Sequence, residues 1–263
     1  MTKQHAALTY SSYLALDEVL NAQRPRSDEH DEMLFIVIHQ VYELWFKQLL
    51  HELDHLQVRL EAGDSSHAIR TLRRILTILK VTVAQIDVLE TMTPSQFTSF
   101  RDRLEASSGF QSGQFRELEA VLGRRDDSVF LHYPEGTAAR EKIAARMSRR
   151  SLYDSFLHYL VKHGYQVPRE ILERDVTKPY QPSPEVQDLL LQVYRDDEVP
   201  ANVCEHLVDL DEGVQEWRYR HVKMVERTIG EKKGTGGSAG AAYLRTTVHK
   251  AHFPDLWAVR NRL

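Results

Sequence analysis

The stretch DEMLFIVIHQVYELWFKQLLHEL (31–53) decides the fold, because its apolar residues recur with the period of an α-helix. At about 100° per residue, one helix face collects Phe35, His39, Tyr42, Phe46, Leu49, Leu53 and Leu60. Acidic residues precede this stripe, where the helix dipole favours anions, and Gly63 follows it as a natural C-terminal cap. We therefore predict one long helix that begins near Ser27 or Asp28 and ends near Ala62.

The rest of the chain continues the helical pattern. No stretch of five or more residues alternates apolar and polar residues between turn pairs, so no significant sheet is expected. The sequence predicts helices over 65–91, from 94 to about 104, up to 122, and over 136–147, 151–163, 184–195, 201–229 and 241–250. A proline-rich loop over 165–184 and a glycine loop over 231–240 separate some of them. The predicted fold class is all-α, a helical bundle with long antiparallel helices.

The amino-acid composition of the chain excludes several classes of protein. The chain has 263 residues, of which 42% are hydrophobic and 27% are charged, so we predict one globular domain over 1–263. A net charge of -4 argues against a non-specific nucleic-acid binder and against a polybasic membrane anchor. A single cysteine, Cys204, excludes an intrachain disulfide, a zinc ribbon and an iron–sulfur cluster. No apolar run approaches the length of a membrane span, so we expect a cytoplasmic protein without a membrane partner.

Two of the thirteen histidines lie on apolar helix faces. His39 lies within the first stripe, and His221 lies at the centre of a stripe about 80° wide on the last long helix. A buried imidazole needs a partner. One interpretation is a core histidine bonded to a carbonyl or carboxylate, and the other is a heme ligand with Trp217 and Val225 packed against it. Together the two histidines favour a common pocket for a cofactor or a substrate.

A third histidine site is His51-Glu52-Leu53-Asp54-His55, which matches the H-E-x-x-H signature of zinc metallopeptidases. Both histidines point away from the apolar stripe of their helix and share the outer surface with Lys47. A catalytic zinc needs a shielded site, so we interpret the match as chance on a solvated face. A zinc peptidase stays open as an alternative.

Two further features have a structural and a functional interpretation. Arg101 follows Phe97 by one helical turn, and is either a surface arginine or a clamp for a carboxylate. The glycine segment GTGGSAG (234–240) lacks the Lys-Ser/Thr ending of a phosphate-binding loop. It is either a linker or a mobile lid in which Thr235 offers a hydroxyl.

Several segments together resemble the tryptophan 2,3-dioxygenase family, whose members use heme to open an indole ring. They occur in the family's order over nearly the whole chain and are LTYSSYLALDEVLNAQ (8–23), DEMLFIVIHQVYELWFKQLLHEL (31–53), LETMTPSQFTSFRDRL with SSGFQSGQFR (89–116), WRYRHVKMVERTIG (217–230) and KGTGGSAG (233–240). The resemblance implies a dioxygenase that converts L-tryptophan and O2 to N-formyl-L-kynurenine, the first step of tryptophan catabolism through the kynurenine pathway. A heme-dependent aromatic hydroxylase of the same superfamily and a non-catalytic heme-binding helical protein stay open as alternatives.

The resemblance also implies roles for single residues. His221 would be the proximal ligand of the iron of heme b, one heme per subunit, with Trp217 and Ser108 also at the cofactor. His39 would be the catalytic distal histidine, bonded to the indole N–H. The substrate residues implied are Phe35, Ile36, Val37, Ile38 and Phe97 around the ring, Arg101 at the carboxylate and Thr235 at the amino-acid head group.

An arm over residues 1–26 would reach a neighbouring subunit and close its pocket with Tyr10, Tyr13 and Leu14. This resemblance implies a homotetramer, a dimer of dimers. The sequence departs from the family pattern at three positions: Phe97 replaces a frequent tyrosine, Ala239 a serine and Gly113 a larger residue.

Overall fold

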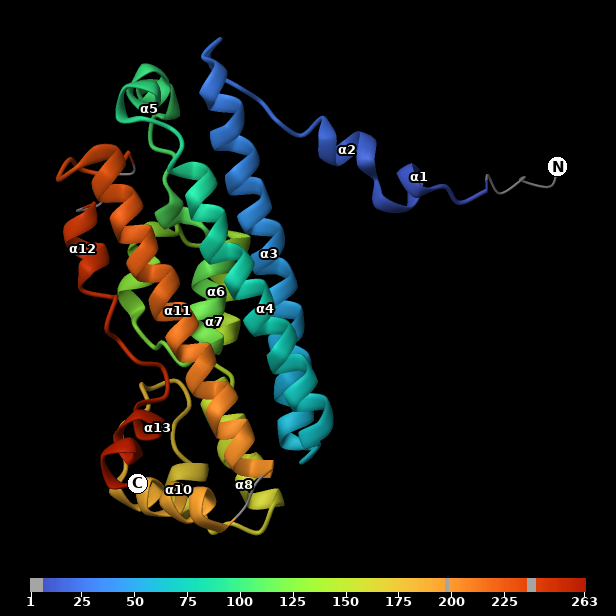
Figure 1. Ribbon diagram of the computed structural model, residues 1–263, viewed down its shortest axis with the longest axis vertical. Coiled ribbons are helices and arrows are strands. Elements are labelled where there is room, and N and C mark those ends of the chain that lie inside the picture. The colour runs from blue at the N-terminus through green and yellow to red at the C-terminus, as the bar shows by residue number, and fades with distance from the viewer. Residues whose placement is uncertain (1–6, 197–198, 236–239) are drawn as a thin grey trace.

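Three long helices set the shape of the molecule in this computed structural model, which describes residues 7–196, 199–235 and 240–263. Helices α3 (His30–Glu61), α4 (Ser65–Leu89) and α11 (Val199–Ile229) follow the long axis, and α3 and α11 run in opposite directions (Figure 1). The described ranges contain helices and no strand, so the predicted all-α class is confirmed. None of these helices combines the length and the apolar character needed to cross a membrane.

Local contacts explain where α3 begins and ends. The carboxylate of Glu32 accepts hydrogen bonds from the amides of Arg26 and Ser27, both at 2.8 Å. These bonds hold the chain before α3 outside the helix, so α3 begins at His30 and not at Ser27 or Asp28 as predicted. Beyond its C-terminus, Gly63 has a φ of 75°, a left-handed conformation that favours glycine. The chain then turns directly into α4.

Shorter helices complete the bundle. They are α5 (Pro94–Arg101), α6 (Gly113–Val121), α7 (Ala138–Met147), α8 (Leu152–Lys162), α10 (Pro184–Asp196) and α12 (Ala241–Arg245). Capping boxes are present at Thr93 before α5 and at Ser151 before α8. The last of these helices, α12, ends at Arg245 and not near Lys250 as predicted.

In the body of the molecule, the sequence did not predict several short elements. They are α9 (Arg169–Leu172) inside the predicted loop, α13 (Pro254–Ala258) and the 3₁₀ segments Gly109–Gln111, Asp127–His132 and Val259–Arg262. Helices of four or five residues gain little from intrinsic propensity. The second of them, α13, is held by a buried carboxylate: Asp255 accepts hydrogen bonds from Tyr180 at 2.6 Å and from Gln187 at 2.8 Å. These partners lie far away in sequence, so periodicity gives no sign of them.

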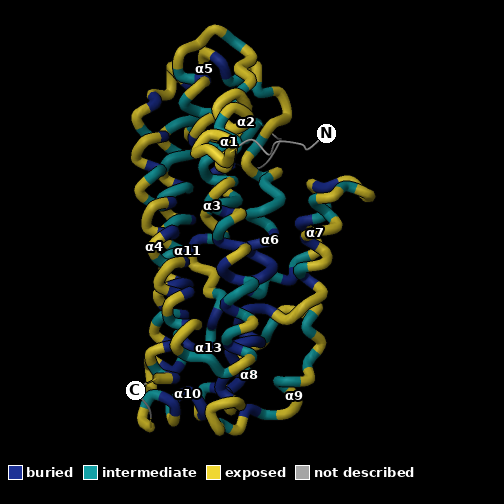
Figure 2. Tube along the Cα trace, turned by 90° about the vertical axis from the view of Figure 1, so that its right-hand side faces the viewer, coloured by how far each residue is buried: buried dark blue, intermediate teal, exposed yellow. Residues whose placement is uncertain are grey.

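One large apolar core joins α3, α4, α8, α10 and α11. Its fully buried side chains include Leu53, Leu56, Leu60, Leu72, Phe156, Val203 and Leu207. The buried positions gather in the middle and lower part of the molecule (Figure 2). A smaller cluster lies at the end that carries α5, where Ile38 packs with Leu89, Met92, Phe97 and Phe100. This end of the bundle therefore has less packed core, and it is here that the functional cavity opens.

The N-terminal segment stands away from the body of the molecule (Figure 1). It forms two short helices, α1 (Tyr10–Leu14) and α2 (Leu16–Leu20), which no sequence pattern predicted. Tyr10 and Tyr13 are 77% and 72% exposed. A hydrogen bond of 2.6 Å from Gln23 to Gln40 connects the end of the segment to α3. The described part of this segment is thus an arm that exposes apolar residues and has no core of its own. Residues 1–6 lie outside the described ranges.

Candidate functional site

A cavity of about 240 Å³ lies between the two helices that carry the predicted histidines. Residues of α3, α4, α5, α6, α11 and α12 line it. The aromatic and aliphatic part of the lining includes Phe35, Tyr42, Phe46, Leu89, Phe97, Phe110, Phe115, Trp217, Met224, Val225 and Ile229. His39 on α3 and His221 on α11 both face this space, as the two apolar stripes predicted. A mostly apolar cavity with few polar groups is typical of a small-molecule or cofactor site.

His39 is fixed in one tautomer by its own helix. Its Nδ1 lies 2.7 Å from the carbonyl oxygen of Phe35, and a carbonyl only accepts hydrogen bonds, so Nδ1 carries the proton. The Nε2 atom is then a hydrogen-bond acceptor that no group of its own helix uses. Burial lowers the pKa of His39, although the bond to Phe35 and the charge of Glu43 act in the opposite direction. The imidazole is therefore neutral at pH 7 and ready to accept an N–H from a ligand.

His221 lies in a different environment from His39. Burial, together with the nearby His39 and Arg116, lowers its pKa to about 4. The ring stacks on Trp217 with a centroid distance of 5.0 Å and an interplanar angle of 16°. Within the part of the chain that the structure describes, no hydrogen bond holds the imidazole of His221. A neutral imidazole that faces a cavity with an uncommitted nitrogen is a suitable metal ligand.

Arg101 and Thr235 lie where the chain closes over the cavity. Nη2 of Arg101 donates to the carbonyl oxygen of Lys233 at 2.6 Å, and the hydroxyl of Thr235 donates to the carbonyl oxygen of Ser107. Both contacts tie the segment after α11 to the segment around α5. No carboxylate of the described residues lies within ion-pair distance of Arg101. Its remaining donors are thus available to an anionic group; residues 236–239, including Ala239, lie outside the described ranges.

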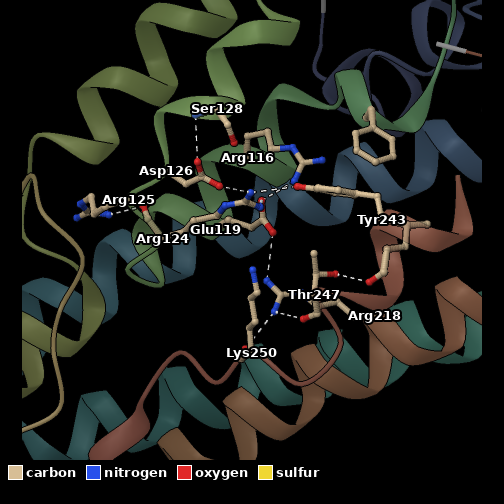
Figure 3. Close-up of polar contacts among 12 residues, drawn as sticks. Arg116, Glu119, Arg124, Arg125, Asp126, Ser128, Arg218, Tyr243, Thr247 and Lys250 are labelled. Carbon is tan, nitrogen blue, oxygen red and sulfur yellow. Dashed lines mark hydrogen bonds and ion pairs between the residues drawn. The ribbon is translucent and has the colours of Figure 1, made fainter. Parts of the chain in front are cut away.

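A buried charged cluster forms the other end of the cavity (Figure 3). Glu119 on α6 accepts hydrogen bonds from Arg116 at 2.6 Å, from Arg124 at 2.9 Å and from Arg218 at 3.1 Å. Burial alone would raise the pKa of Glu119, but the three guanidinium groups outweigh it and lower the pKa, so the carboxylate is ionised. Arg124 also pairs with Asp126 at 2.9 Å. Arg116 and Arg218 both line the cavity beside Glu119, so two guanidinium groups lie at this end, which we call the cationic end.

Sequence reasoning missed this cluster. Arg116 and Glu119 are three residues apart on a helix, a spacing that often marks an ion pair. That spacing did not indicate that the pair belongs to the site. The third member of the cluster, Arg218, lies on another helix, 99 positions after Glu119. Arg218 also donates to the carbonyl oxygens of Thr247 and Lys250, at 3.2 and 3.3 Å. The cluster therefore depends on tertiary structure that no local pattern reports.

The structure brings together eight of the predicted site residues and leaves six outside the cavity. The lining contains Phe35, His39, Phe97, Arg101, Ser108, Trp217, His221 and Thr235. Ile36, Val37 and Ile38 do not line it, because consecutive residues of a helix point about 100° apart and only Phe35 and His39 face inward. Val37 is 37% exposed, and Ile38 packs into the small cluster beside α5. Tyr10, Tyr13 and Leu14 lie on the arm, away from the cavity of their own chain.

The H-E-x-x-H segment is not arranged as a zinc site. His51 is exposed, and His55 is partly buried and not fully solvent-facing as predicted, with Nε of Arg59 donating to it at 3.3 Å. Glu52 is buried and engaged by Arg74 at 3.0 Å and by Gln48 at 2.7 Å. In the described ranges, no group of three or more histidine, cysteine or acidic side chains converges to hold a metal ion. A glutamate held in an ion pair does not suit the catalytic base of a peptidase.

Comparison with known proteins points in the same direction as the cavity. The family model described as tryptophan 2,3-dioxygenase matches residues 1–144 and 188–263. A tryptophan 2,3-dioxygenase of Anaeromyxobacter sp. (strain K) is 65% identical over 258 residues, which cover 98% of this chain and 97% of the relative. Tryptophan 2,3-dioxygenases of Herpetosiphon aurantiacus and Caulobacter vibrioides are 60% and 46% identical over 97% of this chain and 98% of each relative.

Proposed function

The chain belongs to the tryptophan 2,3-dioxygenase family, and on this premise we propose that it inserts both atoms of O2 across the indole C2–C3 bond of L-tryptophan. The product is N-formyl-L-kynurenine. This proposal rests on the observation that one cavity holds two histidines in different environments. Nε2 of His39 is a free hydrogen-bond acceptor, and the ring of His221 makes no hydrogen bond among the described residues. The alternatives of the sequence analysis have no observation in their favour.

The residues of the cavity fit heme b. The neutral ring of His221 suits axial ligation of iron, and Trp217 stacks against that ring. The apolar walls suit a porphyrin, and the cationic end formed by Arg116 and Arg218 suits its carboxylate groups. Ser108 lies in the same lining. When bound, ferrous heme supplies the binding and activation of O2, which no side chain can provide.

His39 provides the polar contact for the indole ring. Because Nδ1 is bound to the carbonyl oxygen of Phe35, Nε2 can accept the indole N–H. Phe35 packs beside the imidazole with a centroid distance of 4.1 Å, and Phe97 lies 5.7 Å from Phe35. These rings form an apolar wall that would orient an indole by its faces and edges.

Arg101 and Thr235 provide the contacts for the amino-acid group. A guanidinium with uncommitted donors can pair with the substrate carboxylate, and the Thr235 hydroxyl can contact the head group. Holding the head group at one end and the indole N–H at the other leaves the C2–C3 bond in one position. The protein's own contribution is then positioning in a site that excludes water.

We extend the proposal to the assembly. The arm presents Tyr10, Tyr13 and Leu14 to solvent, and such an apolar surface is typical of a subunit contact. In a homotetramer the arm of one chain would close the cavity of its neighbour. We also propose that residues 1–263 act as one domain, because α3, α4, α8, α10 and α11 share one core, and that the protein works in the cytoplasm.

The experiment that tests the function follows the oxygen atoms. Purified protein loaded with heme and reduced is given L-tryptophan and 18O2, and the product is analysed by mass spectrometry. We expect N-formylkynurenine with two labelled oxygen atoms. A product with one labelled atom would show a hydroxylase, and heme binding without any product would show a non-catalytic binding protein.

A further inference from the structure

A second cavity lies deeper in the bundle than the proposed heme site. It has a volume of about 40 Å³ and lies between α3, α4, α6 and α11. Its aliphatic walls are formed by Leu53, Ile75, Leu79, Leu122, Leu210 and Val214, and each of these residues is buried. None of the residues assigned to substrate or heme contact apart from Trp217 belongs to its lining. The function described above leaves this space unexplained.

The lining cannot hold a water molecule well. Glu119 belongs to the lining, but its carboxylate oxygens are bound by arginines, and the hydroxyl of Thr82 donates to the carbonyl oxygen of Leu79 at 2.8 Å. Nε1 of Trp217 is a buried donor that interacts with the hydroxyl of Tyr42 and makes no well-formed hydrogen bond among the described residues. A buried water needs about two to four polar partners, and none of these three polar groups exposes a polar surface to the cavity. Cavities lined in this way stay dry and take up small apolar molecules.

A wall of three aromatic rings separates this cavity from the proposed heme site. Phe46, Phe115 and Trp217 line both spaces. Their ring centroids are 5.5 Å apart for Phe46 and Phe115, and 4.8 Å apart for Phe115 and Trp217. Phe115 and Trp217 are the two residues of the smaller cavity's lining that are not fully buried. These rings are therefore the barrier that lies between the two spaces.

The size and the polarity of the smaller cavity together limit which ligand can bind in it. The space is far too small for an aromatic amino acid, and its dry walls disfavour any charged or strongly polar molecule. We propose that this cavity is a docking site for dioxygen, which waits behind the aromatic wall before it reaches the reaction site. This inference rests on the proposed function, because only a reaction that consumes O2 gives the site that occupant.

Xenon tests the cavity independently of catalysis. It is an apolar probe that occupies dry cavities of proteins. Crystals of the heme-loaded protein under xenon pressure should show an anomalous peak in the space bounded by Leu79, Leu210 and Val214. The absence of a peak there in the unsubstituted protein would overturn the proposal.

A matched pair of substitutions on α11 then tests the role. Val214→Ile adds one methylene group to the cavity, whereas Val203→Ile adds the same group to a core position on the same helix that does not line it. We expect Val214→Ile to lose the xenon peak and to lower kcat/KM for O2 by about threefold or more, with the KM for L-tryptophan unchanged. Val203→Ile should keep the xenon peak and the O2 kinetics of the unsubstituted protein.

The outcomes separate this inference from the function on which it rests. A xenon peak with equal O2 kinetics in the two variants would overturn the docking site while the dioxygenase activity stands. A xenon peak in a protein that forms no oxygenated product from L-tryptophan would instead overturn the proposed function, and with it O2 as the occupant.

Discussion

At the scale of single residues, the proposed binding of the substrate depends most directly on the partner of Arg101. Its guanidinium makes one hydrogen bond, to the carbonyl oxygen of Lys233, and has no carboxylate partner among the described residues. It lines the same cavity as His39 and Thr235. The proposed carboxylate partner is therefore the substrate itself.

The substitution Arg101→Ala tests this pairing. Breaking a buried ion pair leaves the other charge unpaired, at a cost of about 3–5 kcal/mol. We therefore expect kcat/KM for L-tryptophan to fall by about 100-fold or more, since about 1.4 kcal/mol corresponds to a factor of ten. Steady-state kinetics measure the change, and the Soret absorbance should show unchanged heme content.

Tryptamine, which lacks the carboxylate, is the control substrate. The unsubstituted protein should already use it poorly, and Arg101→Ala should lose little more. Equal losses on tryptophan and tryptamine would mean that Arg101 supports the fold or the heme and does not bind the carboxylate.

His252 gives a prediction for the pH dependence of stability. Burial, followed by the charge of Arg218, lowers the pKa of His252 to about 4, although Asp211 and Glu119 act in the opposite direction. Nε2 of His252 lies 3.2 Å from Nη2 of Arg218, which can only donate, so the imidazole accepts and is neutral. In the unfolded chain its pKa is the ordinary value of about 6.5. The unfolded state therefore takes up a proton before the folded state does, and acid favours unfolding.

As the pH falls from 6.5 to 4, this group should reduce the free energy of unfolding by up to about 1.4 kcal/mol per pH unit. Urea unfolding at a series of pH values measures the slope in the unsubstituted protein and in His252→Gln, which keeps an acceptor and cannot titrate. We expect a shallower slope in His252→Gln and an unchanged slope in the exposed His51→Gln. The same slope in all three proteins would refute the assignment.

Local periodicity predicted some site residues and could not predict others. His39 and His221 stand out because an imidazole on an apolar stripe is visible in the sequence alone, and both face the cavity. The arginines around Glu119 have no such signal, because they come from α6, the turn after it and α11. The prediction that Ile36 to Ile38 line the pocket followed a family resemblance and did not account for the direction in which each side chain leaves the helix.

At the scale of elements, Glu119 ties α6 to α11 and to the segment before α13. Arg218 of α11 donates to Glu119 and to the carbonyl oxygens of Thr247 and Lys250 (Figure 3). One carboxylate therefore orders three segments around the cationic end of the cavity. Since all its partners are positively charged and partly or fully buried, the network depends on its negative charge.

Glu119→Gln removes that charge with little change of shape. We expect the free energy of unfolding to fall by about 3–5 kcal/mol, because buried guanidinium groups lose their counter-ion. Urea unfolding followed by circular dichroism measures the loss. Glu216→Gln, an exposed position on α11, is the control and should stay within about 0.5 kcal/mol of the unsubstituted protein. A loss in Glu119→Gln as small as that of the control would contradict a charge-dependent network.

The long elements were predictable from sequence, and the short ones were not. The sequence pattern placed α4 and α8 within about two residues of their observed ends, and it placed the start of α5 correctly but its end about three residues too late. By contrast, α9 and α13 are too short to have a periodic signal. The position of α13 depends on the buried carboxylate of Asp255, whose partners are distant in sequence. Such elements follow from the tertiary fold and do not determine it.

At the scale of the whole molecule, the N-terminal arm extends away from the body of its own chain (Figure 1). Its exposed apolar residues contribute to none of the three buried clusters. Deleting residues 1–26 removes α1 and α2, and the remaining helices should therefore keep their contribution to the circular dichroism spectrum. We expect the deletion to reduce the molar mass measured by light scattering from that of a tetramer to that of a smaller species. An unchanged molar mass would refute the arm as a subunit contact.

The central claim is that one cavity uses its two histidines for different purposes, His221 for iron and His39 for substrate. The most direct test is the Soret absorbance per chain after loading with heme, in His221→Ala and in His39→Ala, with circular dichroism to verify the fold. We predict that His221→Ala loses stoichiometric heme binding, and that His39→Ala keeps it but weakens the binding of L-tryptophan. Full heme binding in His221→Ala, or its loss in His39→Ala, would contradict the account.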